Sequence, residues 1–153
     1  MRNKRIMVVG AKGCGKTSLV NYINDYTGPL KRTQDTIYTG LTIDVPSAFV
    51  ENAWMYQHVI ALSQDACCVL IMVDQSRPVE IYSYGFAKAL YCPSFGVISK
   101  CDQKHENRYR CEEQLRMIGV KEPFYAISLT EGIGVDILKK RLIGFKEGRG
   151  SNL

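Results

Sequence analysis

The sequence predicts an α/β fold: a mostly parallel six-stranded sheet with one antiparallel edge strand and helices on both faces. Apolar, β-branched runs alternate along the chain with segments whose apolar residues recur at helical spacing. This alternation is typical of a parallel sheet that is covered by its connecting helices. Residues 66–73 are apolar without a break, as expected of a central strand buried on both faces. A Thr39-Gly40 turn between residues 36–38 and 41–44 indicates a hairpin, which supplies the antiparallel strand.

The chain order of the elements follows from local patterns. Gly119 comes directly after a polar helical pattern, where a glycine commonly ends a helix. Gly28-Pro29 breaks the first helix, so residues 26–36 are expected to form a mobile loop. No linker or repeat is evident, and residues 1–153 are expected to form one domain with a short flexible tail at about 147–153. Strands are expected at residues 5–9, 36–38, 41–44, 66–73, 95–99 and 123–127, and helices at 17–25, 54–63, 85–91, 106–118 and 135–145.

Composition and charge exclude several classes of protein. The chain is 46% hydrophobic and 23% charged, which is ordinary for a globular protein. Its longest apolar run falls far short of the roughly 20 residues that span a bilayer, so no transmembrane segment is expected. The six cysteines lack C-x-x-C spacing, which favours reduced thiols in a cytoplasmic protein over disulfides or a zinc site. The net charge of +5 is mild, and no specific nucleic-acid partner is expected.

A phosphate-binding loop follows the first expected strand. Residues 10–17 match the pattern G-x-x-x-x-G-K-[ST], with an apolar strand before them and a helical segment after them. Glycines let successive backbone N–H groups turn toward an anion, and the helix N-terminus adds partial positive charge. Lys16 is expected to reach the β- and γ-phosphates as a catalytic group, and the Thr17 hydroxyl to bind Mg²⁺. The nucleotide-binding residues expected in this segment are Gly10, Lys12, Gly13, Cys14, Gly15, Lys16, Thr17 and Ser18.

Polar residues also close three later strands, at the sheet edge where ligands bind in such folds. Asp44 ends an apolar strand and is expected to hold Mg²⁺, usually through water, although it could simply form a turn. Asp102 follows another strand, where its carboxylate can accept hydrogen bonds from N1 and N2 of guanine. The ligand expected is therefore GTP or GDP with Mg²⁺. The residues expected at the base are Ser99, Lys100 and Asp102, joined by Ser128 and Leu129 through their backbone N–H groups.

The order of these motifs resembles that of the Ras-like, translation-factor-related P-loop GTPases over residues 4–145. At several segments the chain is more closely similar to the EutP/PduV family of small P-loop proteins. That resemblance implies a cytoplasmic bacterial protein of ethanolamine or propanediol utilisation, with partners at a microcompartment shell or among its enzymes. The segments are Met7-Val8-Val9-Gly10, Cys14-Gly15-Lys16-Thr17-Ser18-Leu19, Arg32-Thr33-Gln34, Ile43-Asp44-Val45-Pro46, Glu51-Asn52, and Val97-Ile98-Ser99-Lys100 with Asp102.

The resemblance also assigns roles around the γ-phosphate, and the chain departs from the pattern there. By position, Thr33 is implied to sense the γ-phosphate and to help bind Mg²⁺; Thr36 is the alternative, and an ordinary polar loop residue is equally compatible. The family's Asp-x-Pro-Gly ends in Ser47 here, which lacks the conformational freedom of glycine. Ala48 follows it, so no glutamine stands there to orient an attacking water as in Ras. Arg32 could supply, from within the same chain, an arginine that stabilises charge in the transition state.

Three functions are compatible with these motifs. The first is a guanine-nucleotide-binding protein with weak GTP hydrolysis that acts in the assembly, positioning or regulation of a bacterial microcompartment. The second is a non-hydrolysing binding module in which the nucleotide only stabilises the fold. The third is a small P-loop kinase for a short-chain carboxylate such as acetate, because the loop also fits the tighter G-x-x-G-x-G-K-[ST] spacing.

Overall fold

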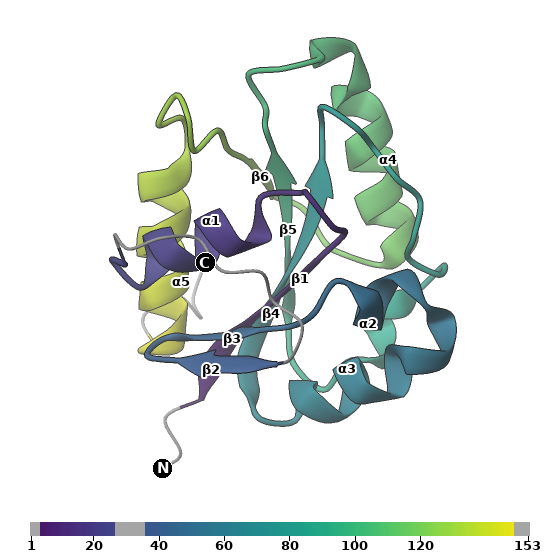
Figure 1. Ribbon diagram of the computed structural model, residues 1–153, viewed down its shortest axis with the longest axis vertical. Helices are drawn as coiled ribbons and strands as arrows, with labels where there is room; N and C mark the ends of the chain where they lie inside the picture. Colours follow the sequence, from purple (N-terminus) through teal and green to yellow (C-terminus); the bar gives the residue numbers. More distant parts are fainter. Residues whose placement is uncertain (1–3, 27–35, 149–153) are drawn as a thin grey trace.

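In the computed structural model, which describes residues 4–26 and 36–148, six strands form one sheet in the order β2-β3-β1-β4-β5-β6 (Figure 1). Five strands run parallel, and β2 pairs antiparallel with β3 at one edge. The expected hairpin, the mostly parallel sheet and the antiparallel edge strand are therefore confirmed. The strands are β1 (Arg5–Gly10), β2 (Ile37–Thr39), β3 (Thr42–Asp44), β4 (Ala66–Asp74), β5 (Ser94–Ser99) and β6 (Phe124–Ala126).

Helices cover both faces of the sheet. Figure 1 shows α1 and α5 on one face and α2, α3 and α4 on the other. The helices are α1 (Lys16–Ile23), α2 (Ala48–Glu51), α3 (Tyr56–Ser63), α4 (Arg108–Ile118) and α5 (Val135–Lys146). Three short 3-10 helices join them: η1 (Ala53–Met55), η2 (Phe86–Ala89) and η3 (His105–Asn107).

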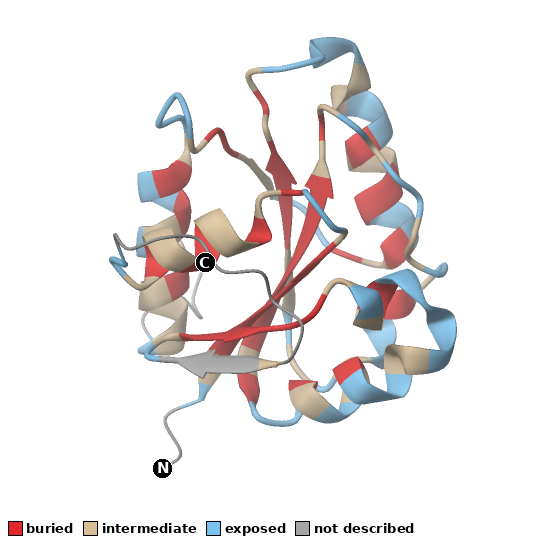
Figure 2. Cartoon of the chain, in the orientation of Figure 1, coloured by how far each residue is buried: buried red, intermediate tan, exposed pale blue. Residues whose placement is uncertain are grey.

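Alternation along the strands divides the core into two layers. Along β1, Ile6 and Val8 pack with α1 and α5, whereas Met7 and Val9 pack with the opposite helices. All four side chains are fully buried, and Figure 2 shows buried residues along the central strands with exposed residues on the outer sides of the helices. This two-sided burial holds the carboxyl ends of the parallel strands at one edge of the sheet.

Two short elements differ from the expectation. Residues 85–91 do not form an α-helix; only the 3-10 helix η2 is present, followed by extended backbone at Leu90. Gly85 has a φ of 73°, in the left-handed region, so helical backbone begins only at Phe86 and four residues remain before the extended Leu90. The helix α2 was not expected, because four residues are too few to show a helical period. The expected mobile loop lies mostly, and the expected tail partly, outside the described residues.

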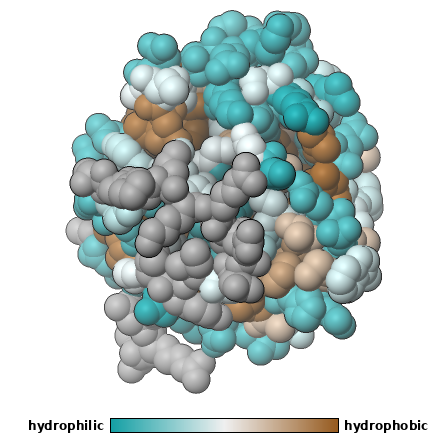
Figure 3. All heavy atoms as spheres, viewed as in Figure 1, coloured by the Kyte–Doolittle hydropathy of each residue, from teal (hydrophilic) through white to brown (hydrophobic). Residues whose placement is uncertain are grey.

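The surface gives two further observations. Among residues 4–26 and 36–148, no helix combines the length and the hydrophobicity needed to cross a bilayer. The face in view in Figure 3 is largely hydrophilic, with its hydrophobic residues in separate patches.

Candidate functional site

The phosphate loop lies at the middle of the sheet edge. It follows β1, which pairs with β3 on one side and with β4 on the other, and it leads directly into α1. Gly13 and Gly15 have φ of 82° and 95°, in the left-handed region that residues with a Cβ rarely adopt. Two glycines in these positions let the loop curve around an anion at the N-terminus of α1. The sequence pattern thus has the strand, loop and helix that its chemistry requires.

Lys16 and Asp44 form a buried ion pair across the loop. Lys16 Nζ lies 2.7 Å from Asp44 Oδ1, and the two side chains are 6% and 5% exposed. The register of the sheet creates this contact, because Asp44 pairs with Val8 just before the loop begins. Lys16, as a buried lysine of the phosphate loop, is positioned to bind an anionic ligand. In this structure it contacts Asp44, the carboxylate that is predicted to bind Mg²⁺.

The donor groups near this pair fit Mg²⁺. A hydroxyl from Thr17 and a carboxylate from Asp44 are both hard oxygen ligands, which Mg²⁺ prefers. Asp44 would have to exchange its contact with Lys16 for one with the ion or an ion-bound water. Thr33, the third expected ligand, lies outside the described residues, and Thr36 is at the start of the described segment that leads into β2. The metal site stays a prediction.

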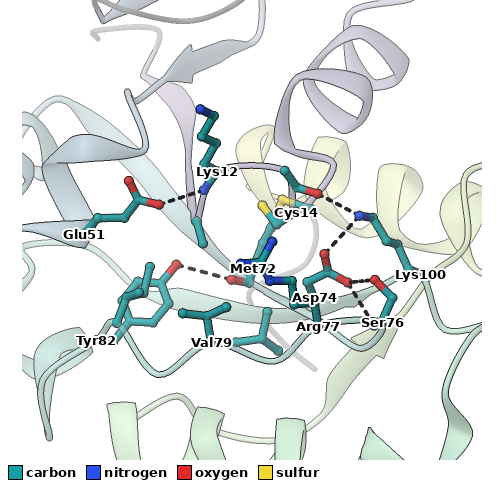
Figure 4. Close-up of a pocket in the computed structure, with 14 residues that line it drawn as sticks. Lys12, Cys14, Glu51, Met72, Asp74, Ser76, Arg77, Val79, Tyr82 and Lys100 are labelled. Carbon is teal, nitrogen blue, oxygen red and sulfur yellow. Dashed lines mark hydrogen bonds and ion pairs between the residues drawn. The ribbon is translucent and has the colours of Figure 1, made fainter.

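Ser99 and Lys100 are joined directly to the phosphate loop. Ser99 Oγ donates to the Cys14 carbonyl at 2.7 Å, and Lys100 Nζ donates to the Gly13 carbonyl, also at 2.7 Å. Lys100 Nζ also lies 3.0 Å from Asp74 Oδ2 (Figure 4). Lys100 itself has a φ of 56°, an uncommon conformation for a residue other than glycine, asparagine or aspartate. The structure therefore brings the two motifs together, although they are more than 80 residues apart in sequence.

Asp102 presents an unsatisfied carboxylate oxygen. Its Oδ1 atom is buried and makes no hydrogen bond with the rest of the described chain. Buried polar atoms are nearly always hydrogen-bonded, because an unpaired acceptor away from water is costly. This oxygen belongs to the residue that the sequence predicts to accept hydrogen bonds from guanine.

A buried polar network supports the segment around Asp102. Gln75 is fully buried, and its Nε2 donates to the carbonyls of Cys101 at 3.1 Å and Gln103 at 2.8 Å. Its Oε1 accepts a hydrogen bond from Arg108 Nε at 2.6 Å. The carbonyls on either side of Asp102 are therefore fixed by one side chain. The sequence pattern assigned no role to Asp74 or Gln75. The available signal was their position, as a polar pair directly after the long apolar run 66–73.

The end of β6 differs in detail from the expectation. Ser128 is fully buried, and its backbone N–H donates to the Ile133 carbonyl at 2.9 Å. This N–H is therefore occupied in the present conformation. The Ser128 hydroxyl accepts a hydrogen bond from the Glu131 N–H at 3.2 Å, which shapes the turn after the strand. Base contacts by Ser128 and Leu129 stay predictions.

A cavity of about 590 Å³ opens between the phosphate loop, α2 and the segment after β4 (Figure 4). Apolar side chains line part of this cavity. Three cationic side chains and two carboxylates also line it. The connection between β4 and β5 supplies one wall of the cavity, and it carries only the short η2, whereas crossovers between parallel strands usually carry a full helix. The lining residues that the argument uses are Lys12, Cys14, Glu51, Asp74, Arg77 and Lys100.

The cysteines of the site are shielded. All six cysteines are free thiols. Cys14 is 1% exposed, and burial raises its pKa to about 11, so the thiol is protonated at neutral pH. Burial also raises the pKa of Cys101. Both thiols are therefore expected to behave as small apolar side chains.

Known proteins resemble this chain in sequence. The family model described as "Ethanolamine utilisation - propanediol utilisation" (PduV-EutP) matches residues 3–143. The propanediol utilization protein PduV of Citrobacter freundii is 30% identical over 134 residues, which cover 87% of this chain and 89% of that protein. The "Probable acetate kinase EutP" of Salmonella typhimurium is 26% identical over 131 residues, covering 82% and 80% of the two chains.

A solved structure resembles it in fold. The crystal structure of "a probable GTP-binding protein engB" matches with a TM-score of 0.68 at 18% identity, over 95% of this chain and 99% of that one. This similarity confirms the predicted P-loop GTPase fold, and the family match confirms the resemblance seen in the motifs. The chain therefore belongs to the PduV-EutP family of ethanolamine and propanediol utilisation.

Proposed function

We propose that this protein binds GTP or GDP with Mg²⁺ at the phosphate loop and hydrolyses GTP slowly. The observation that carries the choice of base is the buried, unsatisfied Oδ1 of Asp102, which can accept from N1–H and N2–H of guanine. Adenine has no donor at position 1 and no amino group at position 2, so the same carboxylate would lose both partners. Lys100 and Ser99, tied to the loop, hold this acceptor at a fixed place relative to the phosphates.

The remaining roles follow from position. Lys16 and several backbone N–H groups of the loop bind the β- and γ-phosphates. Thr17 and Asp44, with Thr33 or Thr36 from the preceding loop, are the candidates to hold Mg²⁺. The metal ion neutralises charge on the β- and γ-phosphates when bound. Hydrolysis is expected to be weak, because Ser47 and Ala48 stand where Ras-like GTPases use glycine and glutamine.

Calorimetry of the wild-type chain tests the proposal. With Mg²⁺ present, GDP is expected to bind at least about 100-fold more tightly than ADP, because a site built around a hydrogen bond rejects an analogue that lacks the donor. Equal affinities for the two nucleotides, or no binding of either, would overturn it.

The cellular role proposed is in the assembly, positioning or regulation of a microcompartment for ethanolamine or propanediol catabolism, with shell proteins or enclosed enzymes as partners. The family membership supports this role. Exposed aromatic residues such as Trp54, 73% exposed, offer contact area for a protein partner. Co-purification with shell proteins in the presence of GTP, compared with GDP, would test it; retention that ignores the nucleotide would argue against a regulated role.

A second candidate function is phosphoryl transfer to a short-chain carboxylate. The cavity beside the phosphate loop favours it, because the side chains of Lys12 and Arg77 line the cavity and make no ion pair within residues 4–26 and 36–148. A relative is also described as a probable acetate kinase. Formation of an acyl phosphate from acetate or propionate with GTP or ATP, trapped with hydroxylamine, would support this candidate; GDP and phosphate as the sole products would exclude it.

A further inference from the structure

The chain lacks the glutamine that orients the attacking water in Ras-like GTPases, and the structure shows what occupies that region. Ala48 begins the short helix α2, and its methyl group offers no hydrogen bond to water. Ser47 has φ −56° and ψ −35°, which is ordinary helical backbone. Its carbonyl accepts hydrogen bonds from the N–H groups of Val50 and Glu51, so α2 is anchored at this residue.

This helix places a carboxylate against the phosphate loop. Glu51 is the last residue of α2, one turn after Ser47, and its Oε2 accepts a hydrogen bond from the Lys12 backbone N–H at 3.0 Å. Figure 4 shows the Glu51 side chain reaching across the cavity to the loop. A carboxylate at an anion-binding loop is notable, because that loop is built to accept a phosphate.

The position of the hydrogen bond between Lys12 and Glu51 indicates what the carboxylate can do. Lys12 lies within the loop four residues before Lys16, and both Lys12 and Glu51 line the cavity beside the loop. Because Lys16 and other N–H groups of this loop are proposed to bind the β- and γ-phosphates, Glu51 lies beside the expected position of the phosphate chain. A carboxylate has about four lone-pair sites, so the bond to Lys12 leaves capacity for a water molecule.

We propose that Glu51 orients the water that attacks the γ-phosphate, in place of the missing glutamine. This inference rests on the proposed GTP-binding function. Glu51 keeps its hydrogen bond to Lys12, which fixes the carboxylate, and accepts a second one from the water. The water oxygen then forms a bond to the γ-phosphorus, and the bond from that phosphorus to the β–γ bridging oxygen breaks.

The products balance without a further reactant. The electron pair of the broken bond stays on the β-phosphate of GDP. The proton lost by the water passes to a non-bridging oxygen of the released phosphate. Glu51 is thus unchanged at the end of the reaction, and its contribution is orientation. Because an anion held close to the γ-phosphate also repels it, this arrangement fits slow hydrolysis.

The test compares two substitutions at Glu51. An amide oxygen can accept the same two hydrogen bonds, so Glu51→Gln is expected to keep most of the single-turnover rate of GTP hydrolysis. Glu51→Ala removes both contacts and is expected to lower that rate on the order of 10- to 100-fold. Both variants should bind GDP as tightly as the wild type, because Glu51 is not placed at the base or at the β-phosphate.

The matched control is Glu113→Ala. Glu113 is also a partly exposed helical glutamate, and it pairs with Arg116 at 2.9 Å on α4, away from the phosphate loop. Exposed pairs of this kind contribute little to stability. The control variant is expected to hydrolyse GTP at the wild-type rate.

The outcomes separate this inference from the proposed function. A chain that binds no guanine nucleotide refutes both. If the wild type binds GTP and hydrolyses it, but Glu51→Ala does so equally fast, the role of Glu51 is wrong while the function stands. The role is also wrong if Glu51→Gln is as slow as Glu51→Ala, or if Glu51→Ala weakens GDP binding in proportion to its loss of rate. A wild type that binds GTP without any turnover likewise overturns the role.

Discussion

At the scale of single residues, the Lys16–Asp44 pair connects folding with ligand binding. Both side chains are almost fully buried, and each is the partner of the other before a nucleotide binds. A buried ion pair is weak evidence for net stability, but the loss of one member leaves an uncompensated charge. The same two residues are expected to serve phosphate and Mg²⁺, so ligand binding must exchange one set of charged contacts for another.

This exchange gives a stability prediction for the nucleotide-free protein. Lys16→Met removes the cation that lies 2.7 Å from the buried Asp44 carboxylate and is expected to lower the free energy of unfolding by about 3 kcal/mol in urea. The double variant Lys16→Met, Asp44→Asn removes the charge and should recover part of that loss. A single variant as stable as the wild type would contradict the interpretation of the pair.

A second prediction concerns thiol reactivity. The hydrogen-bonding contact between the sulfurs of Cys67 and Cys68, 3.9 Å apart, lowers the pKa of Cys67 to about 7, whereas burial raises the pKa of Cys14 to about 11. The thiolate is the reactive form, so alkylation of half-buried Cys67 should accelerate as pH rises through about 7 and then level off. Mass spectrometry after brief iodoacetamide treatment shows which cysteine is alkylated first, with Cys67→Ser as the control. Modification of Cys14 before Cys67 would refute it.

Gln75 carries a third prediction, because it acts on the base site only through the backbone around Asp102. Gln75→Leu leaves the carbonyls of Cys101 and Gln103 without their donor and is expected to cost about 2 kcal/mol of stability. It should also reduce the preference for GDP over ADP, measured by calorimetry.

The matched control for Gln75 is Gln114→Leu. Gln114 is also buried, but it donates to the Val79 carbonyl at 2.8 Å and not to a carbonyl beside Asp102. A smaller loss of stability is expected, because only one carbonyl loses its donor, with unchanged nucleotide preference. If both variants change that preference equally, Gln75 has no specific positioning role.

At the scale of elements, the strands and the long helices could be predicted, whereas two short helical elements could not. The apolar run of β4 and the helical spacing of α5 were sufficient to place both elements within one residue of their observed ends. The four residues of α2 carry no period, and the 3-10 helix η2 stands where an α-helix was expected. The helix α2 contributes Glu51 to the lining of the cavity, which is why the sequence did not indicate that cavity.

The helix α2 also carries a prediction. Ser47 anchors its start in helical backbone, and glycine at such a position costs only a few tenths of a kcal/mol. Ser47→Gly should therefore leave stability nearly unchanged, while its freer backbone N–H can turn toward the γ-phosphate and raise the single-turnover rate of GTP hydrolysis. An unchanged rate would show that the missing glycine does not limit turnover.

At the scale of the whole molecule, the sheet explains how distant motifs meet. Strand order places β1 between β3 and β4, so the residues closing each strand converge at one edge. That convergence could be predicted, because parallel strands share their carboxyl edge. The hydrogen bond between Lys100 and Gly13 and the one between Glu51 and Lys12 could not be predicted. Both depend on side-chain directions, which no local sequence pattern indicates.

The central claim is that the unsatisfied carboxylate of Asp102 selects guanine. The direct measurement is calorimetry of Asp102→Asn with GDP and with xanthosine diphosphate, which carries a carbonyl where guanine has its 2-amino group. The asparagine amide can donate to that carbonyl, so affinity for GDP should fall about 100-fold or more and affinity for xanthosine diphosphate should rise. A variant that binds GDP as tightly as the wild type, with no gain for xanthosine diphosphate, would contradict the account.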